Sequence, residues 1–233
     1  KIPRGLNVAG FQRINAKDTV VIIDSGVPES FNATYKAHSC TSNFELSYKK
    51  KRIFINSNPF FKNNLNKSTA SHSTLTLDNT NAYKLLSNDY LSRIPENIKI
   101  KRIERYGDNF LEIENYSYKQ QFDATYKRSF YISKTGTDIR GEENIYCPSE
   151  LDFSIRFYLD ESIKTSIINN GKSILLKLSN GTGWRFMSSL SKIDLISNKY
   201  IGINKQPKVS EHILLQGKTS ELITVVKWSL KKY

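Results

Sequence analysis

The sequence predicts an all-β fold: a large antiparallel β-sandwich of two or more stacked sheets, with few or no helices. Short apolar runs of strand length recur along the 233 residues, and Gly, Asn, Asp and Ser separate them. Several runs alternate polar and apolar residues, as in Ile98-Lys99-Ile100-Lys101, which places the apolar side chains on one face of a strand. No sustained helical period accompanies these runs, so stacked antiparallel sheets are the expected architecture.

The first expected strands lie in the N-terminal part of the chain. Val20-Val21-Ile22-Ile23 is among the longest apolar stretches, far shorter than the about 18 residues of a membrane helix. Lys49-Lys50-Lys51 separates two strands and is typical of a solvated hairpin tip. The expected strands are residues 10–15, 19–24, 43–48, 52–56, 73–77 and 98–106.

The remaining strands follow the same punctuation. Gly turns at Thr135-Gly136-Thr137 and Asn180-Gly181-Thr182 lie between apolar runs. A short helix is expected over residues 81–91, and the Asn- and Lys-rich stretch 58–71 is expected to be a loop. The further expected strands are residues 110–118, 129–133, 153–159, 173–178, 184–188, 212–216 and 222–230.

Composition indicates a globular chain with a positive charge, which either reflects polyanion binding or results from AT-rich coding. The sequence is 38% hydrophobic and 24% charged, and no linker divides residues 1–233 into separate domains. Lys+Arg is 35 and Asp+Glu is 22, so the net charge is 35 − 22 = +13. Acidic polysaccharide, nucleic acid and anionic membrane all suit that charge, as does AT-rich coding. Cys40 and Cys147 are far apart in the sequence, and we expect two free thiols; one long-range disulfide is the alternative.

Two of the three histidines stand at the edges of strand-like runs, where a sheet can hold an imidazole toward a ligand. The runs at 43–48 and 52–56 separate His38 from His72, so the two rings converge if these strands are neighbours. Asn56 ends the second run. Two imidazoles and one oxygen can form a zinc site, although an amide oxygen is a weaker zinc ligand than a carboxylate. Two hydrogen-bonded structural histidines are the alternative.

Basic residues with aromatic neighbours are a second signal. Arg128 lies between Tyr126 and Phe130, and Arg156 lies within Phe153-Ser154-Ile155-Arg156-Phe157. Arginine beside aromatic rings suits sugar acids or stacked bases, and it also suits the ordinary outer face of a sheet. No catalytic triad, phosphate-binding loop or dinucleotide-binding motif is visible.

One ordered set of motifs covers nearly the whole chain. It runs from His38 through Phe44-Glu45-Leu46 and a basic hairpin to the segment Ser71-His72-Ser73-Thr74-Leu75-Thr76-Leu77-Asp78. In order and spacing, this set resembles the C-terminal β-sheet domain of the heparinase II/III-like polysaccharide lyases. The supporting segments are Gly10-Phe11-Gln12-Arg13, Arg128-Ser129-Phe130-Tyr131, Asp138-Ile139-Arg140-Gly141-Glu142 and Gly183-Trp184-Arg185-Phe186.

The resemblance implies that residues 1–233 are the β-sandwich domain of a longer protein whose N-terminal α/α toroid is absent here. The family cleaves acidic, uronate-containing polysaccharides such as glycosaminoglycans by β-elimination. A Tyr or His base removes the proton beside the uronate carboxylate, and an acid protonates the leaving oxygen. The implied partners are therefore an anionic polysaccharide and the toroid. A periplasmic location is implied in the same way, while the residues themselves leave the compartment open.

The resemblance also assigns residues. His38 and His72 match metal-binding histidines of the family, which makes zinc the implied cofactor. Asn56 falls where the family usually has an aspartate ligand, and Lys36 falls where it has a further histidine. Cys40 stands where many members have aspartate.

We expect a domain that acts on or binds acidic polysaccharide, with Lys36, Arg128 and Arg156 as substrate contacts. One alternative is a non-catalytic carbohydrate-binding or structural β domain, which the residues at positions 36, 40 and 56 favour. The other is a nucleic-acid binder, which the charge of +13 favours although no recognised nucleic-acid motif is present. We expect neither a specific nucleic-acid partner nor a membrane span.

This chain alone is expected to be inactive as a lyase, because no complete base–acid set lies within it. The measurement is the ultraviolet absorbance of unsaturated uronate product after incubation with acidic polysaccharide. Product formed by this chain alone would contradict the prediction.

Overall fold

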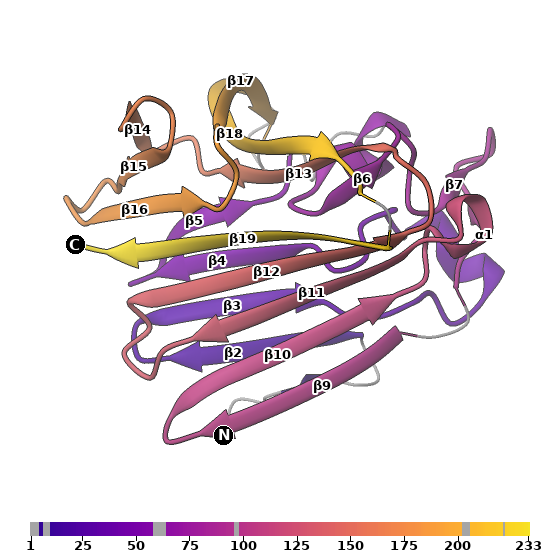
Figure 1. The fold of residues 1–233 in the computed structure, drawn as a ribbon, viewed down its shortest axis with the longest axis horizontal. Coiled ribbons are helices and arrows are strands. Elements are labelled where there is room, and N and C mark those ends of the chain that lie inside the picture. Colours follow the sequence, from indigo (N-terminus) through magenta and orange to yellow (C-terminus); the bar gives the residue numbers. More distant parts are fainter. Residues whose placement is uncertain (1–4, 7–9, 58–63, 96–97, 202–205, 221) are drawn as a thin grey trace.

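The computed structural model describes residues 5–6, 10–57, 64–95, 98–201, 206–220 and 222–233. Two large antiparallel sheets lie one behind the other, so the predicted all-β sandwich is confirmed (Figure 1). Within the described residues, no helix has the length and apolar character needed to cross a membrane. Both cysteines are free, as predicted, and both are buried.

The first sheet has nine strands in the order β1-β2-β3-β4-β5-β13-β18-β17, with β6 paired to β13. Its N-terminal strands form a meander in which each strand pairs with the next along the chain. The bounds are β1 (Gly5–Leu6), β2 (Phe11–Ala16), β3 (Thr19–Asp24), β4 (Phe44–Tyr48), β5 (Lys51–Ile55), β6 (Leu75–Leu77), β13 (Asp152–Leu159), β17 (Asp194–Ile201) and β18 (Pro207–Lys218).

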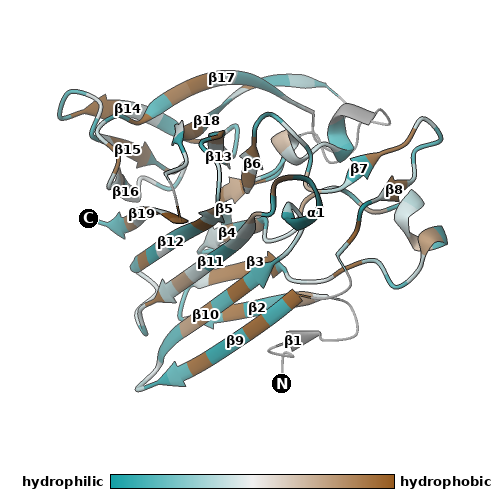
Figure 2. Ribbon diagram, turned by 45° about the vertical axis from the view of Figure 1, so that its right-hand side comes forward, coloured by the Kyte–Doolittle hydropathy of each residue, from teal (hydrophilic) through white to brown (hydrophobic). Residues whose placement is uncertain are grey.

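The second sheet has eight strands in the order β14-β15-β16-β19-β12-β11-β10-β9. Hydrophilic and hydrophobic residues alternate along β9 and β10, as the period of two predicts (Figure 2). The bounds are β9 (Ile98–Arg105), β10 (Asp108–Asn115), β11 (Thr125–Ile132), β12 (Asp138–Cys147), β14 (Lys164–Ile168), β15 (Ser173–Lys177), β16 (Gly183–Ser188) and β19 (Leu222–Lys232).

An aromatic core joins the two sheets. Phe44 of the first sheet lies 5.0 Å, between ring centroids, from Phe130 of the second and stacks on Trp228 at 5.8 Å. Phe157 closes the group, 5.1 Å from Trp228. Each buried aromatic side chain contributes about 1.5–3 kcal/mol through the area it removes from water, so this cluster fixes how the sheets stack.

The predicted helix at residues 81–91 is wrong. This segment forms a small hairpin of β7 (Lys84–Leu85) and β8 (Leu91–Ser92). Asp89 turns the chain with a φ of 68°, and the Leu86 amide donates to the Tyr90 carbonyl at 2.9 Å. A left-handed residue at this point ends a helix rather than continuing it.

Further differences concern strands and short turns. The strands β1, β12, β14 and β17 were not predicted. The stretch expected as a loop contains two 3-10 turns, η3 (Asn64–Lys67) and η4 (Thr69–Ser71), while its residues 58–63 lie outside the described part. In the described residues, the other helical turns are η2 (Phe31–Tyr35) and α1 (Lys119–Phe122).

Candidate functional site

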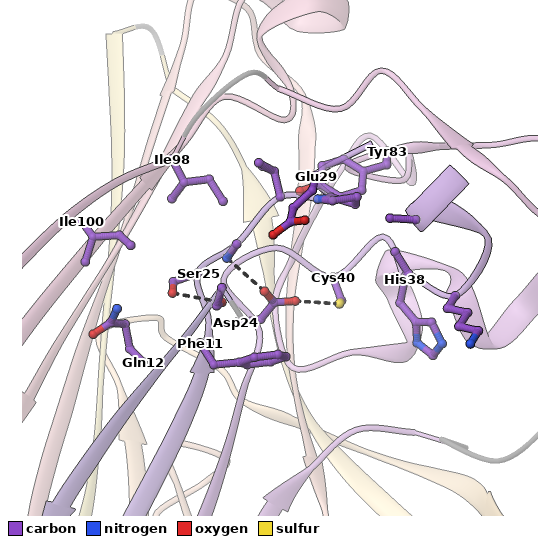
Figure 3. A pocket seen from close by; sticks show the side chains of 17 residues that line it. Phe11, Gln12, Asp24, Ser25, Glu29, His38, Cys40, Tyr83, Ile98 and Ile100 are labelled. Atoms are coloured by element: carbon purple, nitrogen blue, oxygen red, sulfur yellow. Dashed lines mark hydrogen bonds between the residues drawn. The ribbon is translucent and has the colours of Figure 1, made fainter. Parts of the chain in front are cut away.

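A cavity of about 730 Å³ opens at one end of the sandwich, where β2 and β9 begin and β3 ends. We call it the end cavity. Asp24 and Cys40 lie at its centre, His38 on one side, and Ile98 and Ile100 of β9 on the other (Figure 3). The loop after β3 and the segment after η2 supply most of its wall, so residues far apart in sequence meet here.

His38 and His72 form a direct pair. The sequence predicted that the two rings converge if the strands between them are neighbours, and β4 and β5 are paired. His38 Nδ1 lies 3.0 Å from His72 Nε2, and the rings meet edge to face. His72 Nδ1 lies 2.8 Å from the carbonyl oxygen of Ser68. Because only an N–H can donate to a carbonyl, His72 carries its hydrogen on Nδ1, and its Nε2 accepts from the Nδ1–H of His38.

Both imidazoles are held in the neutral form. Burial lowers the pKa of His72 to about 3, and the nearby His38 lowers it further. Burial also lowers the pKa of His38, with a contribution from the positive charge of Lys67. Neutral imidazoles keep a lone pair on one nitrogen, which can accept a proton or bind a metal ion.

The histidine pair fits part of a zinc site. Two nitrogen ligands of one tetrahedral zinc ion lie roughly 3.3 Å apart, close to the 3.0 Å between these imidazole nitrogens. To bind zinc through Nδ1, His38 would carry its hydrogen on Nε2 instead. The bond from His72 Nδ1 to a backbone carbonyl is also the usual support of a metal-binding histidine.

The third ligand position does not fit zinc. The Asn56 side-chain oxygen accepts the amide of Ser73 at 3.3 Å, and its nitrogen donates to Glu45 at 3.1 Å. In the part of the chain that is described, no three His, Cys, Asp or Glu side chains gather closely enough to hold a metal. The protein therefore offers two imidazoles without the anionic ligand of a closed site.

Asp24 and Cys40 form a second polar pair, at the centre of the end cavity. The Cys40 thiol donates to Asp24 Oδ2 at 3.1 Å, and the Gly26 amide donates to Oδ1 at 3.2 Å. Burial raises the pKa of Asp24 to about 6, and burial with the Asp24 charge raises the pKa of the Cys40 thiol. Cys40 therefore stays a thiol at neutral pH. Sequence reasoning missed Asp24, whose only signal is its place at the end of a strand.

Replacing Asp24 with Asn is expected to remove a pH-dependent term from the free energy of unfolding. The folded-state pKa of about 6 lies above the ordinary value of 3.8, so the folded state binds the extra proton between these values. This contribution is fully present below about pH 4 and is lost as the pH rises through about 6. Urea unfolding across this range should show wild type losing about 1–3 kcal/mol relative to Asp24→Asn.

The matched control is Asp18→Asn, because the Asp18 side chain is about half exposed. It should shift the unfolding free energy by a similar small amount at every pH. A constant difference between wild type and Asp24→Asn across the pH range would contradict the prediction.

Lys36, which we predicted as a substrate contact, lies at the end cavity. It caps the end of η2, is exposed, and lines the end cavity together with His38. Arg156 lies elsewhere, on the face of β13 that points away from the core, where its Nη1 donates to Thr76 Oγ1 at 2.8 Å.

The prediction that Arg128 contacts substrate is wrong, because the side chain is fully buried. Its side chain is 0% exposed and pairs through Nε with Glu143, which is equally buried, at 2.9 Å. Its Nη1 donates to the carbonyls of Ser42 at 2.8 Å and Ser73 at 2.6 Å. Ser73 follows His72 in the chain, and Ser42 lies four residues after His38. Arg128 therefore holds the two histidine segments together from inside the core.

Further buried groups donate to Glu143, while Arg128 Nη2 is buried without a hydrogen-bond partner among the described residues. Trp228 Nε1 donates to Glu143 Oε1 at 2.7 Å, and the Tyr126 hydroxyl donates to Oε2. The guanidinium lies over the Phe44 ring, 5.2 Å from its centroid. Such networks are strongly coupled, because losing one member leaves the others buried without partners.

The comparisons with known proteins decide the family. The family model for the heparinase II/III-like C-terminal region matches residues 2–229. The chain belongs to this family. Its fold resembles that of heparan sulfate lyase HepC from Pedobacter heparinus, with a TM-score of 0.77 at 16% identity, covering 97% of this chain and 35% of that one. A heparinase III structure, the BT4657 gene product, gives 0.75 at 14% identity, with 97% and 35% covered.

A curated relative has a different name. FtsZ-localized protein C of Caulobacter vibrioides is 21% identical over 255 residues, which span 99% of this chain and 44% of the relative. The heparinase II/III-like chain described here thus spans less than half of that relative and about a third of the lyase structures.

Proposed function

We propose that this domain binds a uronate-containing acidic polysaccharide at the end cavity, as one wall of a cleft whose other wall is the toroid of the full-length protein. The observation that carries the proposal is the neutral histidine pair beside Lys36 on a cavity of about 730 Å³. Membership of a polysaccharide lyase family supports the choice of ligand. The substrate and the toroid are both part of the proposal.

The residues at the end cavity suit binding better than catalysis. A lysine ammonium pairs with the carboxylate of a uronate. With His38 Nδ1 donating to His72, the lone pair on His38 Nε2 is left to accept a hydrogen bond from a sugar hydroxyl. β-Elimination also needs an acid at the leaving oxygen, and we assign that group, with the principal base, to the toroid. Because the third ligand position does not fit zinc, no step here depends on a metal.

The distribution of charge disfavours the outer face of the second sheet as the binding surface for the polysaccharide. Along β9–β12 and β19, lysines on the outer face of the second sheet pair with carboxylates across strands. These pairs neutralise the surface on which an extended polyanion would otherwise lie. They are Lys99–Glu114, Lys127–Glu112, Lys227–Glu142 and Lys231–Asp138.

Binding of a heparin octasaccharide and of single-stranded DNA with similar charge, each measured across a range of salt concentrations, tests the proposal. We expect the octasaccharide to remain bound at salt concentrations that release DNA, and Lys36→Gln to weaken it. Equal affinities with equally steep salt dependence would mean polyelectrolyte attraction alone and would overturn the proposal.

The name of the curated relative motivates a second candidate, a non-catalytic binding domain. Lys36 and Asn56, which replace a histidine and an aspartate of the family pattern, favour it. Turnover by the full-length protein separates the two candidates, because both predict sugar binding and only one predicts unsaturated product.

A further inference from the structure

Three aromatic rings lie together on the surface beside the end cavity. Phe31 stacks on Tyr90 with centroids 4.9 Å apart and planes within 11°, and Tyr35 lies 5.5 Å from Tyr90. Phe31 is 56% exposed and Tyr35 is 51% exposed. We call this group the aromatic platform. Large apolar side chains grouped on a surface, rather than scattered singly, mark interaction sites.

The backbone beneath the platform is held in place. The Thr34 hydroxyl donates to the Phe31 carbonyl at 2.7 Å and accepts the Leu91 amide at 3.1 Å. Thr34 is fully buried, and Ser30 caps the start of η2 through the Ala33 amide. The rings are therefore presented by a fixed turn, which lowers the entropy cost of binding.

A positive charge adjoins the platform. The Lys67 ammonium donates to the carbonyls of Tyr35 and Asp89 and lies 5.0 Å from the centroid of the Tyr35 ring. Within the described ranges, no carboxylate forms an ion pair with Lys67. The Lys67 carbonyl oxygen accepts the amide of Ser39, the residue after His38, at 2.8 Å, so Lys67 adjoins both the platform and the histidine segment. This arrangement favours a ligand with both a flat apolar face and an acidic group.

The surface between the two sites is hollowed. A second cavity of about 340 Å³ is lined by Phe31 and shares Val27 and Pro28 with the end cavity. An extended polymer could therefore contact the platform and the end cavity together.

We propose that the aromatic platform stacks on one pyranose ring of the acidic polysaccharide, while Lys67 pairs with a carboxylate or sulfate of the same chain. The C–H bonds on one face of a pyranose present a weakly positive surface that matches the negative face of an aromatic ring. The inference rests on the proposed function and adds a sugar subsite separate from the histidine pair. A second copy of the chain and the toroid are the competing occupants.

The test measures heparin octasaccharide affinity across salt for wild type, Phe31→Ala, Tyr35→Ala and Lys67→Gln. Tyr106→Ala is the matched control, because Tyr106 is 86% exposed on the β9–β10 hairpin. We expect each platform variant to weaken binding by about tenfold, as ring stacking does for bases, with an unchanged salt dependence. Lys67→Gln should instead reduce the slope of log affinity against log salt by about one. Tyr106→Ala should bind like wild type.

Three other outcomes of these measurements would overturn the aromatic subsite or the proposed function. If wild type binds the octasaccharide and the platform variants bind equally well, the subsite is wrong while the proposed function stands. If wild type binds no octasaccharide, the proposed function itself fails. If sedimentation shows a wild-type dimer that Tyr35→Ala dissociates, with sugar affinity unchanged, the platform is a self-association surface. Melting temperatures equal to wild type verify that the exposed substitutions leave the fold intact.

Discussion

Arg128→Met is expected to lower the free energy of unfolding by about 3–5 kcal/mol, because it leaves a buried carboxylate without its partner. Glu143 is 0% exposed, and its remaining donors are Trp228 and Tyr126. The substitution also removes the hydrogen bonds to the carbonyls of Ser42 and Ser73. Urea unfolding followed by tryptophan fluorescence measures the loss.

Two further variants make this result specific to the buried pair. Arg128→Met combined with Glu143→Leu should recover part of the stability, since an apolar pair of similar volume avoids the unpaired charge. Arg140→Met, on the neighbouring strand, removes an ion pair whose arginine side chain is 55% exposed and should cost at most about 1 kcal/mol. Equal losses for Arg128→Met and Arg140→Met would contradict the role assigned to Arg128.

Asn56→Asp is expected to strengthen zinc binding at least about tenfold over wild type, because it supplies the carboxylate that the donor set lacks. In wild type, Glu45 accepts a hydrogen bond from Asn56 at 3.1 Å. In the metal-free variant, this hydrogen bond is replaced by repulsion between two carboxylates. We therefore expect Asn56→Asp to melt below wild type in chelator and to recover with zinc. Titration calorimetry and thermal unfolding measure both effects.

Asn144→Asp is the matched control, because the Asn144 nitrogen also donates to a glutamate, Glu142, at 3.0 Å, with no histidine pair at hand. It should gain no zinc affinity. Adding His72→Ala to Asn56→Asp should abolish the gain. Zinc affinity that is the same in wild type and Asn56→Asp would show that Asn56 does not lie at the third ligand position.

Local patterns predicted most of the sheets and failed where tertiary contacts decide. β10 alternates cleanly, and every second residue is buried. β12 contains Gly141 and Glu143 on its buried face, so its buried positions do not form an apolar pattern in the sequence. The Asn- and Asp-rich turn between β7 and β8 was overlooked in favour of a helix, although Asn and Asp are typical of left-handed turns.

The candidate site was predicted where a motif marked it and missed where only the fold assembles it. His38 and His72 were predicted to converge, and they do. Asp24, Lys67 and the aromatic platform come from separate segments whose proximity no spacing reveals. Arg128 was misread, although the signal was present: Tyr126, Arg128 and Phe130 share one strand face, and two aromatics at i±2 place the arginine on the core side.

Hydrogen–deuterium exchange with and without the heparin octasaccharide tests the central claim most directly, because it locates the ligand on the fold. We predict slower exchange in segments 27–40 and 64–91, which carry Lys36, Lys67, the histidine pair and the aromatic platform. Peptides over residues 108–147, on the charge-paired second sheet, should be unchanged. Protection confined to residues 108–147, with none at the end cavity, would contradict the account.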